Sequence, residues 1–478
     1  MSKVAAIIAW VAAPLIAVGV TAVVATVVAT VAVGVVLAAG ATAIANKMAK
    51  SMTPELGTAA EFDIQGSQGI MVNKTGSSQT IPVVYGSTRT GGIRVFAEAN
   101  DTDNKYLHLA FVLSEGEINK MSAIYFDGVL AGSQSSAGAQ DWADGAMVSP
   151  YNGLVKVYFR PGTDTQTEIS GLAGVKSGWD PHFKGIAYVY VRLEYDEEVW
   201  TNGVPQMTFD VEGKKVPSTS DGTSLSYDDN PARCILDMLV NTRYGKGIDP
   251  ADLDLTSFAS AETYCNTKGF ELRGNVSTNG TIYANLIDML TSCRGYIAFG
   301  NQYRLLIDKI DTTDDADIFA ITKDNIIGNV DYVLGDKRNM FNKMTAKFLN
   351  SSTGYKDDIV VIESSTLKTQ DNELSLEAEI PLPFTKTKSV VEQILTEEIN
   401  QSRQSHMIQV KCTVDAIDLQ VGDLVKVTNE TFGITEKKFR VMSTIVEPSS
   451  EVTLSLREYD VDVYGSSIIT DARADDND

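Results

Sequence analysis

Cysteine and histidine are both scarce in this chain of 478 residues, which contains 4 Cys and 3 His. The cysteines are widely spaced, with no CxxC pair and no His at metal-ligand spacing, which argues against a structural zinc or iron–sulfur site. Free cysteines are usually buried among apolar side chains. We therefore expect reduced, buried thiols rather than a disulfide framework at Cys234, Cys265, Cys293 and Cys412.

Basic residues are also in the minority. The chain has 40 Lys and Arg against 62 Asp and Glu, for a formal net charge of -22. A protein built to grip duplex DNA or anionic lipid needs a footprint in which basic side chains dominate. The composition therefore argues against binding of duplex DNA or of an anionic lipid surface as the main function of this protein.

Catalytic signatures are missing from the sequence as well. It contains no nucleophile elbow, phosphate-binding glycine loop, HExxH motif or dinucleotide fingerprint. We therefore predict a protein that is not an enzyme and that has no cofactor and no metal. Two alternatives stay open at this point: residues 249–254 would hold a cation if they folded back on themselves, and two carboxylates meeting across a cleft would suit a glycosidase.

Charge is absent altogether from residues 4–46, which are dominated by Ala and Val. A single helix of that length would reach about 65 Å, roughly twice a hydrocarbon core of about 30 Å, so two shorter helices or a kinked pair fit better. A signal peptide and a self-associating helix are the alternatives. The residues that mark this candidate plug or membrane segment are Val4, Trp10, Pro14, Gly19, Gly34 and Gly40.

The rest of the chain reads as mainly β with a small α/β insert, that is, two β-barrel-like domains plus an α/β module after the apolar N-terminal helical segment. Short β-branched and aromatic runs separated by Gly, Asp and Asn indicate the β regions. The predicted divisions are 1–50 apolar helical segment, 51–80 linker or arm, 81–220 β domain, 221–310 α/β module, 311–465 β-barrel domain with one helix, and 466–478 acidic tail.

Several local patterns are specific enough to place elements. Asn230-Pro231 is an N-cap followed by the favoured first-turn proline, which predicts a helix start. Further helices are expected over 256–266, 283–293 and 389–404, the last from its amphipathic spacing. Regular strand spacing after residue 408 suggests a closed or nearly closed barrel. Residues 131–150, rich in Ala, Gly and Ser, look like an exposed insertion.

Three stretches resemble the tail hub or tail-tip attachment (J-like) proteins of long-tailed bacteriophages. The first runs from Asn230-Pro231-Ala232 to Arg243-Tyr244-Gly245, the second from Ile81 to Gly86, and the third from Leu419 to Val427. The residues that carry the resemblance are Asn230, Pro231, Asp237, Arg243, Tyr244, Gly245, Pro82, Tyr85, Gly86, Gly422 and Asp423.

This resemblance implies a structural virion protein that resembles baseplate hub proteins: a homotrimer whose ring closes the distal end of the tail tube and opens for DNA ejection. It implies as partners the distal tail protein and tail tube, the tape measure protein and other tail-tip or fibre proteins. Genomic DNA would pass through the channel without specific binding, which an acidic lining favours. The protein would be made in the host cytoplasm and located at the distal tail tip of the virion.

The apolar segment departs from the archetype of this family. Three such leaders would plug the tube, insert into the host membrane on ejection, or simply order the trimer. The competing interpretation is a membrane-anchored bacterial envelope protein with β-rich binding domains. The four unpaired-looking cysteines and the order of the phage-like motifs count against that alternative.

Overall fold

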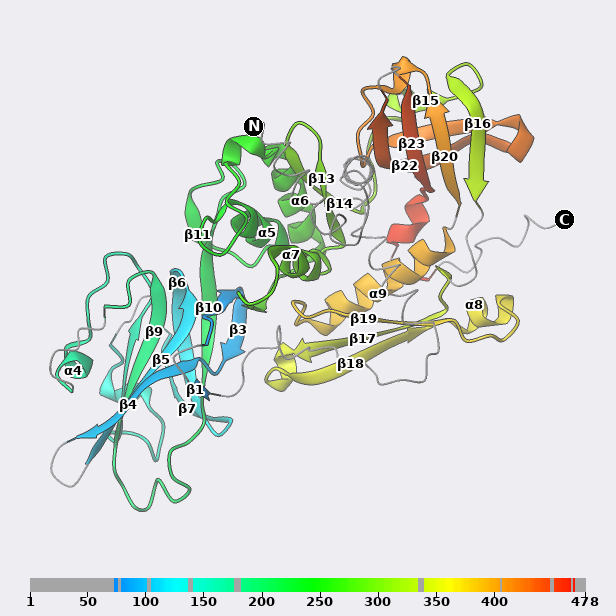
Figure 1. Ribbon diagram of the computed structural model, residues 1–478. Helices are drawn as coiled ribbons and strands as arrows, with labels where there is room; N and C mark the ends of the chain where they lie inside the picture. The colour runs from blue at the N-terminus through cyan, green and yellow to red at the C-terminus, as the bar shows by residue number, and fades with distance from the viewer. Residues whose placement is uncertain are drawn as a thin grey trace, which may run out of the picture.

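The computed structural model describes residues 73–75, 79–100, 105–135, 141–175, 182–333, 339–404, 406–447, 451–465 and 467–468. Figure 1 shows an elongated molecule with a pair of sheets at one end, a helical region in the middle and a small curved sheet at the other end. The predicted class, mainly β with an α/β insert, is confirmed. The domain boundaries stay predictions.

Two five-stranded sheets pack face to face to form the first end of the molecule (Figure 1). One contains, in spatial order, β1 (Lys74–Thr75), β4 (Ile93–Asn100), β5 (Tyr106–Glu115), β9 (Ile186–Glu194) and β8 (Val155–Arg160). The other contains β11 (Leu225–Tyr227), β10 (Met207–Pro217), β6 (Ile118–Phe126) and β7 (Val129–Ser133), with β3 (Ser87–Thr90) also paired to β10.

The first of these sheets is covered on both faces. Leu109 and Phe111 of β5 point into the core between the two sheets, whereas Ala110 and Val112 face a second cluster that includes Leu172 of the short helix α4 (Ser170–Ala173). A strand covered on both faces needs a continuous apolar run rather than an alternating one. The sequence from Leu109 to Leu113 has that character.

The prediction of an exposed insertion over residues 131–150 is only partly right, because most of its described side chains are exposed or half-buried but several belong to the core. Ala131, Trp142 and Met147 are all buried in the core between the two sheets. Two backbone hydrogen bonds tie this segment to neighbouring strands. The N–H of Trp142 donates to Val157 O of β8 at 3.0 Å, and the N–H of Val148 donates to Ala131 O of β7 at 2.9 Å. The many small residues of this segment suggested a loop, but its two large side chains, Trp142 and Met147, pack into the core.

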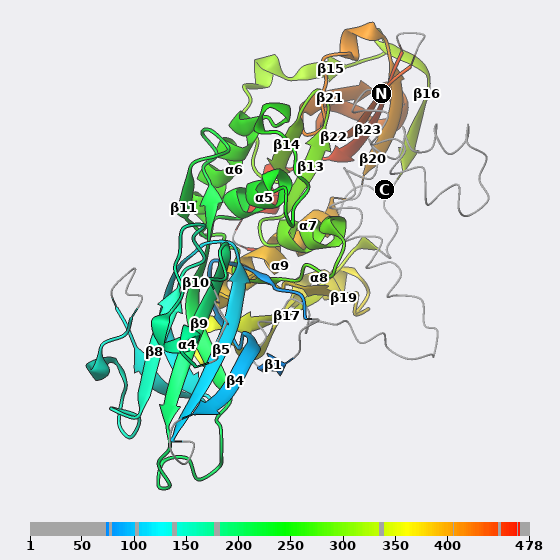
Figure 2. The same ribbon diagram turned by 60° about the vertical axis from the view of Figure 1, so that its left-hand side comes forward.

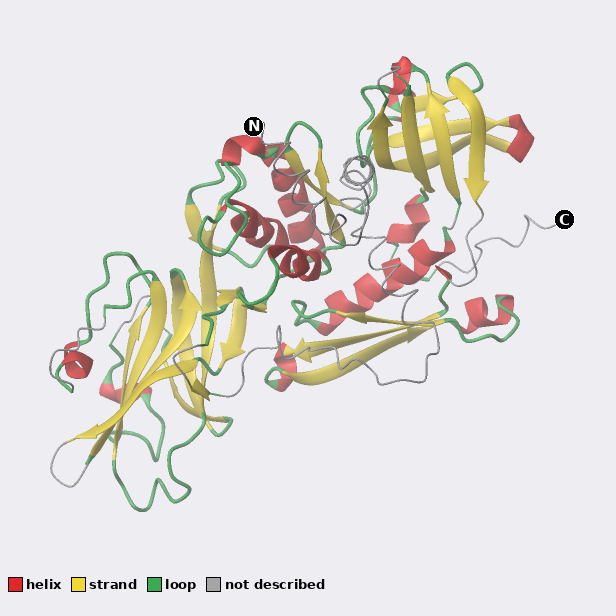
Figure 3. Cartoon of the chain, viewed as in Figure 1, coloured by secondary structure: helices red, strands yellow, loops and turns green. Residues whose placement is uncertain are grey.

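Helices dominate the middle of the molecule (Figure 3). The predicted start at Asn230-Pro231 is confirmed, and Gly269 (φ 69°) ends the second helix in the left-handed conformation that favours glycine. The elements here are β2 (Val83–Tyr85), α5 (Pro231–Val240), α6 (Leu255–Lys268), β12 (Gly274–Val276), α7 (Ile282–Leu290), β13 (Gly295–Phe299) and β14 (Tyr303–Ile307). β2 pairs with β12, and β13 with β14.

A three-stranded sheet carries a long helix along one face, an arrangement visible in both Figure 1 and Figure 2. The predicted amphipathic helix is confirmed, with Val391, Leu395 and Ile399 buried against the sheet. Its core is continuous with that of α5 to α7. The elements are β18 (Lys356–Glu363), β17 (Lys343–Asn350), β19 (Glu377–Pro381), α8 (Ser365–Gln370) and α9 (Lys388–Arg403).

The far end is a six-stranded sheet, which we call the half-barrel. The strands curve around a core of their own, and the sheet follows an open path from β15 to β16. In order they are β15 (Phe319–Ile321), β21 (Leu424–Asn429), β22 (Ile434–Val446), β23 (Val452–Glu458), β20 (Met407–Cys412) and β16 (Ile326–Val333). The sequence predicted a closed or nearly closed barrel; the strands form a half-barrel, which is open because β15 and β16 do not pair with each other.

The cysteine prediction is confirmed, since all four thiols are free and buried. Among the described residues, none of the helices has both the length and the apolar character needed to cross a bilayer. The candidate plug or membrane segment, residues 4–46, lies outside the described residues, and its role stays a prediction.

Replacing Trp142 with Ala should lower the free energy of unfolding of the paired sheets by about 3–5 kcal/mol, because the large side chain fills their shared core. Denaturant unfolding followed by circular dichroism measures this change. Val148→Ala is the matched control, because Val148 lies in the same segment but is 39% exposed, and it should change stability by less than about 0.5 kcal/mol. Equal effects of the two substitutions would contradict the placement of this segment.

Candidate functional site at the junctions

The first of the three motif stretches begins at the N-terminus of α5. The Asn230 side chain accepts a hydrogen bond from the backbone N–H of Ala232 at 2.9 Å and donates to Glu262 O and to Asn266 Oδ1, each at 3.0 Å. Pro231 occupies the first helical turn, where its missing N–H has no cost. One asparagine thus caps α5 and ties it to α6.

A buried carboxylate lies one turn before the end of the same helix. Asp237 accepts hydrogen bonds at its Oδ2 from the hydroxyls of Tyr85 at 2.6 Å and of Tyr244 at 2.5 Å. Burial raises the pKa of Asp237, while Lys214 and the two hydroxyls oppose that rise. Tyr85 ends β2, so the two motifs, far apart in the sequence, meet at this carboxylate.

Asp237 lies at a junction between the paired sheets and α5, which we call the first junction. Two glycines allow backbone segments to pack closely there. A Cβ on Gly86 (φ 61°) would lie 2.6 Å from Leu272 O, and one on Gly245 would lie 2.4 Å from Met238 O. Both distances are far below contact, so any side chain would force the segments apart. Pro82 contributes its carbonyl, which accepts from the backbone N–H of Glu115 at 2.8 Å.

Arg243 extends the motif to the paired sheets. Its Nε lies 2.8 Å from Oε1 of Glu115, the last residue of β5. The Arg243 side chain is 62% exposed, so this ion pair adds little stability by itself. It places a motif arginine on the outer rim of the junction between the paired sheets and α5.

Gly422 and Asp423 are not part of that junction. They lie beside β14, where a Cβ on Gly422 (φ 99°) would come 2.9 Å from Cδ1 of Leu306. The carbonyl of Gly422 accepts from Arg440 Nη1 at 2.9 Å, and the carboxylate of Asp423 accepts from the backbone N–H of Gln420 at 2.8 Å. The third motif therefore shapes a second junction, between the half-barrel and the β13–β14 hairpin.

A second buried carboxylate organises this other junction, and no sequence motif pointed to it. Asp308, directly after β14, accepts from Tyr464 Oη at 2.6 Å and from Arg457 Nη2 at 2.8 Å. Arg294 Nη2 lies 3.5 Å and Arg440 Nε 3.7 Å away from its carboxylate oxygens. We call Asp308, Arg294, Arg440, Arg457 and Tyr464 the Asp308 cluster.

The electrostatics of the Asp308 cluster are tightly balanced. Burial alone would raise the pKa of Asp308, but the arginines outweigh it and hold the pKa well below its ordinary value. Arg294 also contacts Glu397 Oε2 at 2.6 Å and Glu398 Oε1 at 2.7 Å, which links the cluster to α9. A charge directly after an apolar strand was the one sequence signal that could have revealed Asp308.

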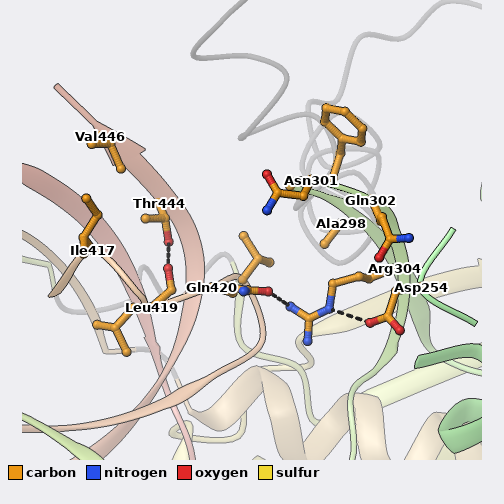
Figure 4. A pocket seen from close by; sticks show the side chains of 13 residues that line it. Asp254, Ala298, Asn301, Gln302, Arg304, Ile417, Leu419, Gln420, Thr444 and Val446 are labelled. Atoms are coloured by element: carbon orange, nitrogen blue, oxygen red, sulfur yellow. Dashed lines mark hydrogen bonds and ion pairs between the residues drawn. The ribbon is translucent and has the colours of Figure 1, made fainter. Parts of the chain in front are cut away.

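A cleft of about 500 Å³ opens beside the second junction (Figure 4). Arg304 spans it, with Nη1 2.6 Å from Gln420 Oε1 and Nε 3.5 Å from Asp254 Oδ2. Asp254 also caps α6, and Asp249 caps the turn before it, so both carboxylates are engaged locally. The side chains around this cleft suit contact between surfaces better than acid–base chemistry.

Within the part of the chain that the structure describes, no three His, Cys, Asp or Glu side chains are grouped so that they could hold a metal ion. At both junctions the buried carboxylate meets hydroxyl or guanidinium donors. Buried polar networks of this kind fix the relative positions of the elements that contribute to them.

Comparison with known proteins adds independent information. No family model matches the chain. Baseplate hub protein pb3 of Escherichia phage T5 is 22% identical, in a match that covers 84% of this chain and 49% of pb3. The chain is a relative of this phage baseplate hub protein. It spans about half the length of that curated relative, and the resemblance stated from the sequence motifs is confirmed.

One solved structure shares the fold of this chain. A chain from the virion of a native gene transfer agent particle aligns with a TM-score of 0.58 and 15% identity, covering 87% of this chain and 91% of that chain. The 43 kDa tail protein of prophage MuSo2 from Shewanella oneidensis reaches a TM-score of 0.32 at 10% identity, covering 81% of this chain and 100% of its own. Only the first of these values is high enough to indicate a shared fold.

Tyr85→Phe should lower the free energy of unfolding by about 1.5–3 kcal/mol, because the buried carboxylate of Asp237 loses a hydroxyl donor. Tyr244→Phe should have a similar effect, and the double variant should depart from additivity because both hydroxyls serve one oxygen. Denaturant unfolding measures all three. Tyr195→Phe is the control, since Tyr195 is 68% exposed; a Tyr85→Phe loss no larger than that of the control would refute the role.

Asp237→Asn tests the raised pKa of the same carboxylate. The folded state holds the proton more tightly than the unfolded chain, so the wild type loses stability as pH rises from the ordinary Asp pKa through the raised one. An amide does not titrate, so the stability of the variant relative to wild type should climb over that window and then level off. Thermal unfolding measured from pH 4 upward checks this; a constant difference across pH would contradict it.

Proposed function

We propose that this protein is a structural hub protein of a phage tail, located at the distal tail tip of the virion. The observation that carries the proposal is the match to baseplate hub protein pb3, which covers 84% of this chain. The fold shared with a chain of the gene transfer agent virion supports it, as does the meeting of two family motifs at Asp237. The junction residues then serve as the scaffold of the hub and not as a catalytic centre.

The finer proposal is a homotrimer whose ring closes the tail tube and opens for DNA ejection. The acidic composition, with a net charge of -22, is compatible with a channel through which DNA slides. The distal tail protein, the tail tube, the tape measure protein and further tip or fibre proteins are the partners of this ring. The apolar residues 4–46 would plug the tube or insert into the host membrane on ejection.

The full chain, purified in a mild detergent that shields residues 4–46, should sediment at three times its mass of 51.6 kDa. Antibodies against the chain should label one end of the tail in electron micrographs of purified particles, and deletion of the gene should leave particles without complete tails. A monomer that fractionates with bacterial membranes and is absent from particles would instead support the envelope protein.

A further inference from the structure

The half-barrel has a hydrophobic core that is separate from its neighbour. Val410, Phe439 and Leu454 are among the residues that pack within it, whereas the core of α5 to α7 continues under α9. Of the described core residues, none is shared between these two clusters. The half-barrel therefore has its own apolar core, and the segment that follows β23 adds an apolar contact to the neighbouring core through Ile468.

Polar contacts connect the half-barrel directly to the β13–β14 side, and they centre on Asp308. This residue belongs to the β13–β14 side, and two half-barrel arginines reach it from β22 and β23. Arg440 also donates from Nη2 to Lys309 O at 2.8 Å. Side chains of Asp308 and Arg440 are 6% and 5% exposed, so the charges meet almost out of water.

The cleft in Figure 4 lies along the same boundary. Its walls come from the tip of the β13–β14 hairpin and from half-barrel residues such as Leu419 and Val446. Movement of the half-barrel away from the β13–β14 hairpin would therefore widen this cleft. The Arg304–Gln420 hydrogen bond is the contact that bridges its mouth.

Buried ion clusters favour discrete states. Each charge is desolvated and depends on its partner, so a partly separated arrangement leaves charges that have neither water nor a partner. In the closed state the Asp308 carboxylate has its partners, whereas Arg440 Nε and Arg457 Nε are buried without a hydrogen-bond partner. Full hydration would satisfy those nitrogens, so an interface of this kind can behave as a two-position device. An apolar interface of the same size would instead resist wetting and hold the parts together.

We propose that the Asp308 cluster is a latch. It holds the half-barrel against the β13–β14 hairpin, and on its release the half-barrel swings away as a rigid unit. The proposal rests on the proposed hub function for its purpose, since a ring that opens for DNA needs a subunit element that moves; the latch itself is a property of the single chain.

Asp308→Asn in the full chain tests the latch, with hydrogen–deuterium exchange as the measurement. We expect amide exchange to rise at least about tenfold in residues 309–317 and 459–464, while the strands β22 and β23 keep their protection. Asp315→Asn is the matched control, because Asp315 also pairs with two basic half-barrel residues, Lys426 and Lys438, but is 62% exposed. Exchange in the control should stay within about twofold of wild type.

Two outcomes would overturn the latch. Unchanged exchange in both connecting segments would show that Asp308 does not hold the half-barrel, and loss of protection in β22 and β23 would make it a residue needed for folding.

A second variant adds Arg304→Cys and Gln420→Cys to Asp308→Asn, and a short bismaleimide joins the two new cysteines. All four native thiols are buried, so the reagent finds the new pair, and the bridge should restore slow exchange; persistently fast exchange would also refute the swing.

These measurements are made on the purified chain, so their result does not depend on assembly into a tail. If Asp308→Asn raises exchange but antibodies never label a tail tip, the hub function is refuted and the latch stands. If antibodies label the tip but Asp308→Asn leaves exchange unchanged, the latch is refuted and the hub function stands.

Discussion

The structure depends on the requirement that a buried carboxylate be fully satisfied. Asp237 and Asp308 are each removed from water, and each accepts at least one hydrogen bond from a distant part of the sequence, from Tyr85 at Asp237 and from Arg457 and Tyr464 at Asp308. Losing a hydroxyl donor to such a group costs about 1.5–3 kcal/mol, and losing the charged partner of a buried ion pair costs about 3–5 kcal/mol. Both exceed what a surface ion pair contributes. Two aspartates therefore set where the paired sheets, the helical region and the half-barrel meet.

The two carboxylates are satisfied in different ways, and the difference has consequences. Neutral tyrosine hydroxyls surround Asp237, whose pKa is raised by burial. Arginines surround Asp308 and hold its pKa low, against the opposing effect of burial. The first junction also has the close glycine contacts of Gly86 and Gly245, so it is a fixed joint. The second joins two separate apolar cores through charge, which is what a movable joint needs.

One fixed junction and one movable junction would suit the structural role proposed for this protein. The motif residues do not converge on a cleft with reactive groups; they shape backbones and tie elements together. In a ring of hub subunits, rigid joints would transmit load along each chain and a charged joint would allow one part to move. The similarity to a phage baseplate hub protein agrees with a structural role for these junctions.

Local sequence chemistry alone determined several elements. Asn230-Pro231 marks a helix start because cap and proline act within one turn, the spacing of Val391, Leu395 and Ile399 marks an amphipathic helix, and isolated cysteines proved to be buried thiols. Each of these depends on neighbours a few positions away. The phage-like motifs likewise were legible as a pattern before their geometry was known.

Only the tertiary structure decided the rest. Residues 131–150 have the composition of a loop, yet Trp142 and Met147 are core residues because the opposite sheet supplies the apolar surface that they cover. Asp308 resembles any other acidic residue until Arg440 and Arg457, well over a hundred positions away, are folded onto it. Burial and charge pairing at long range depend on which segments come together, and composition and periodicity carry no record of that.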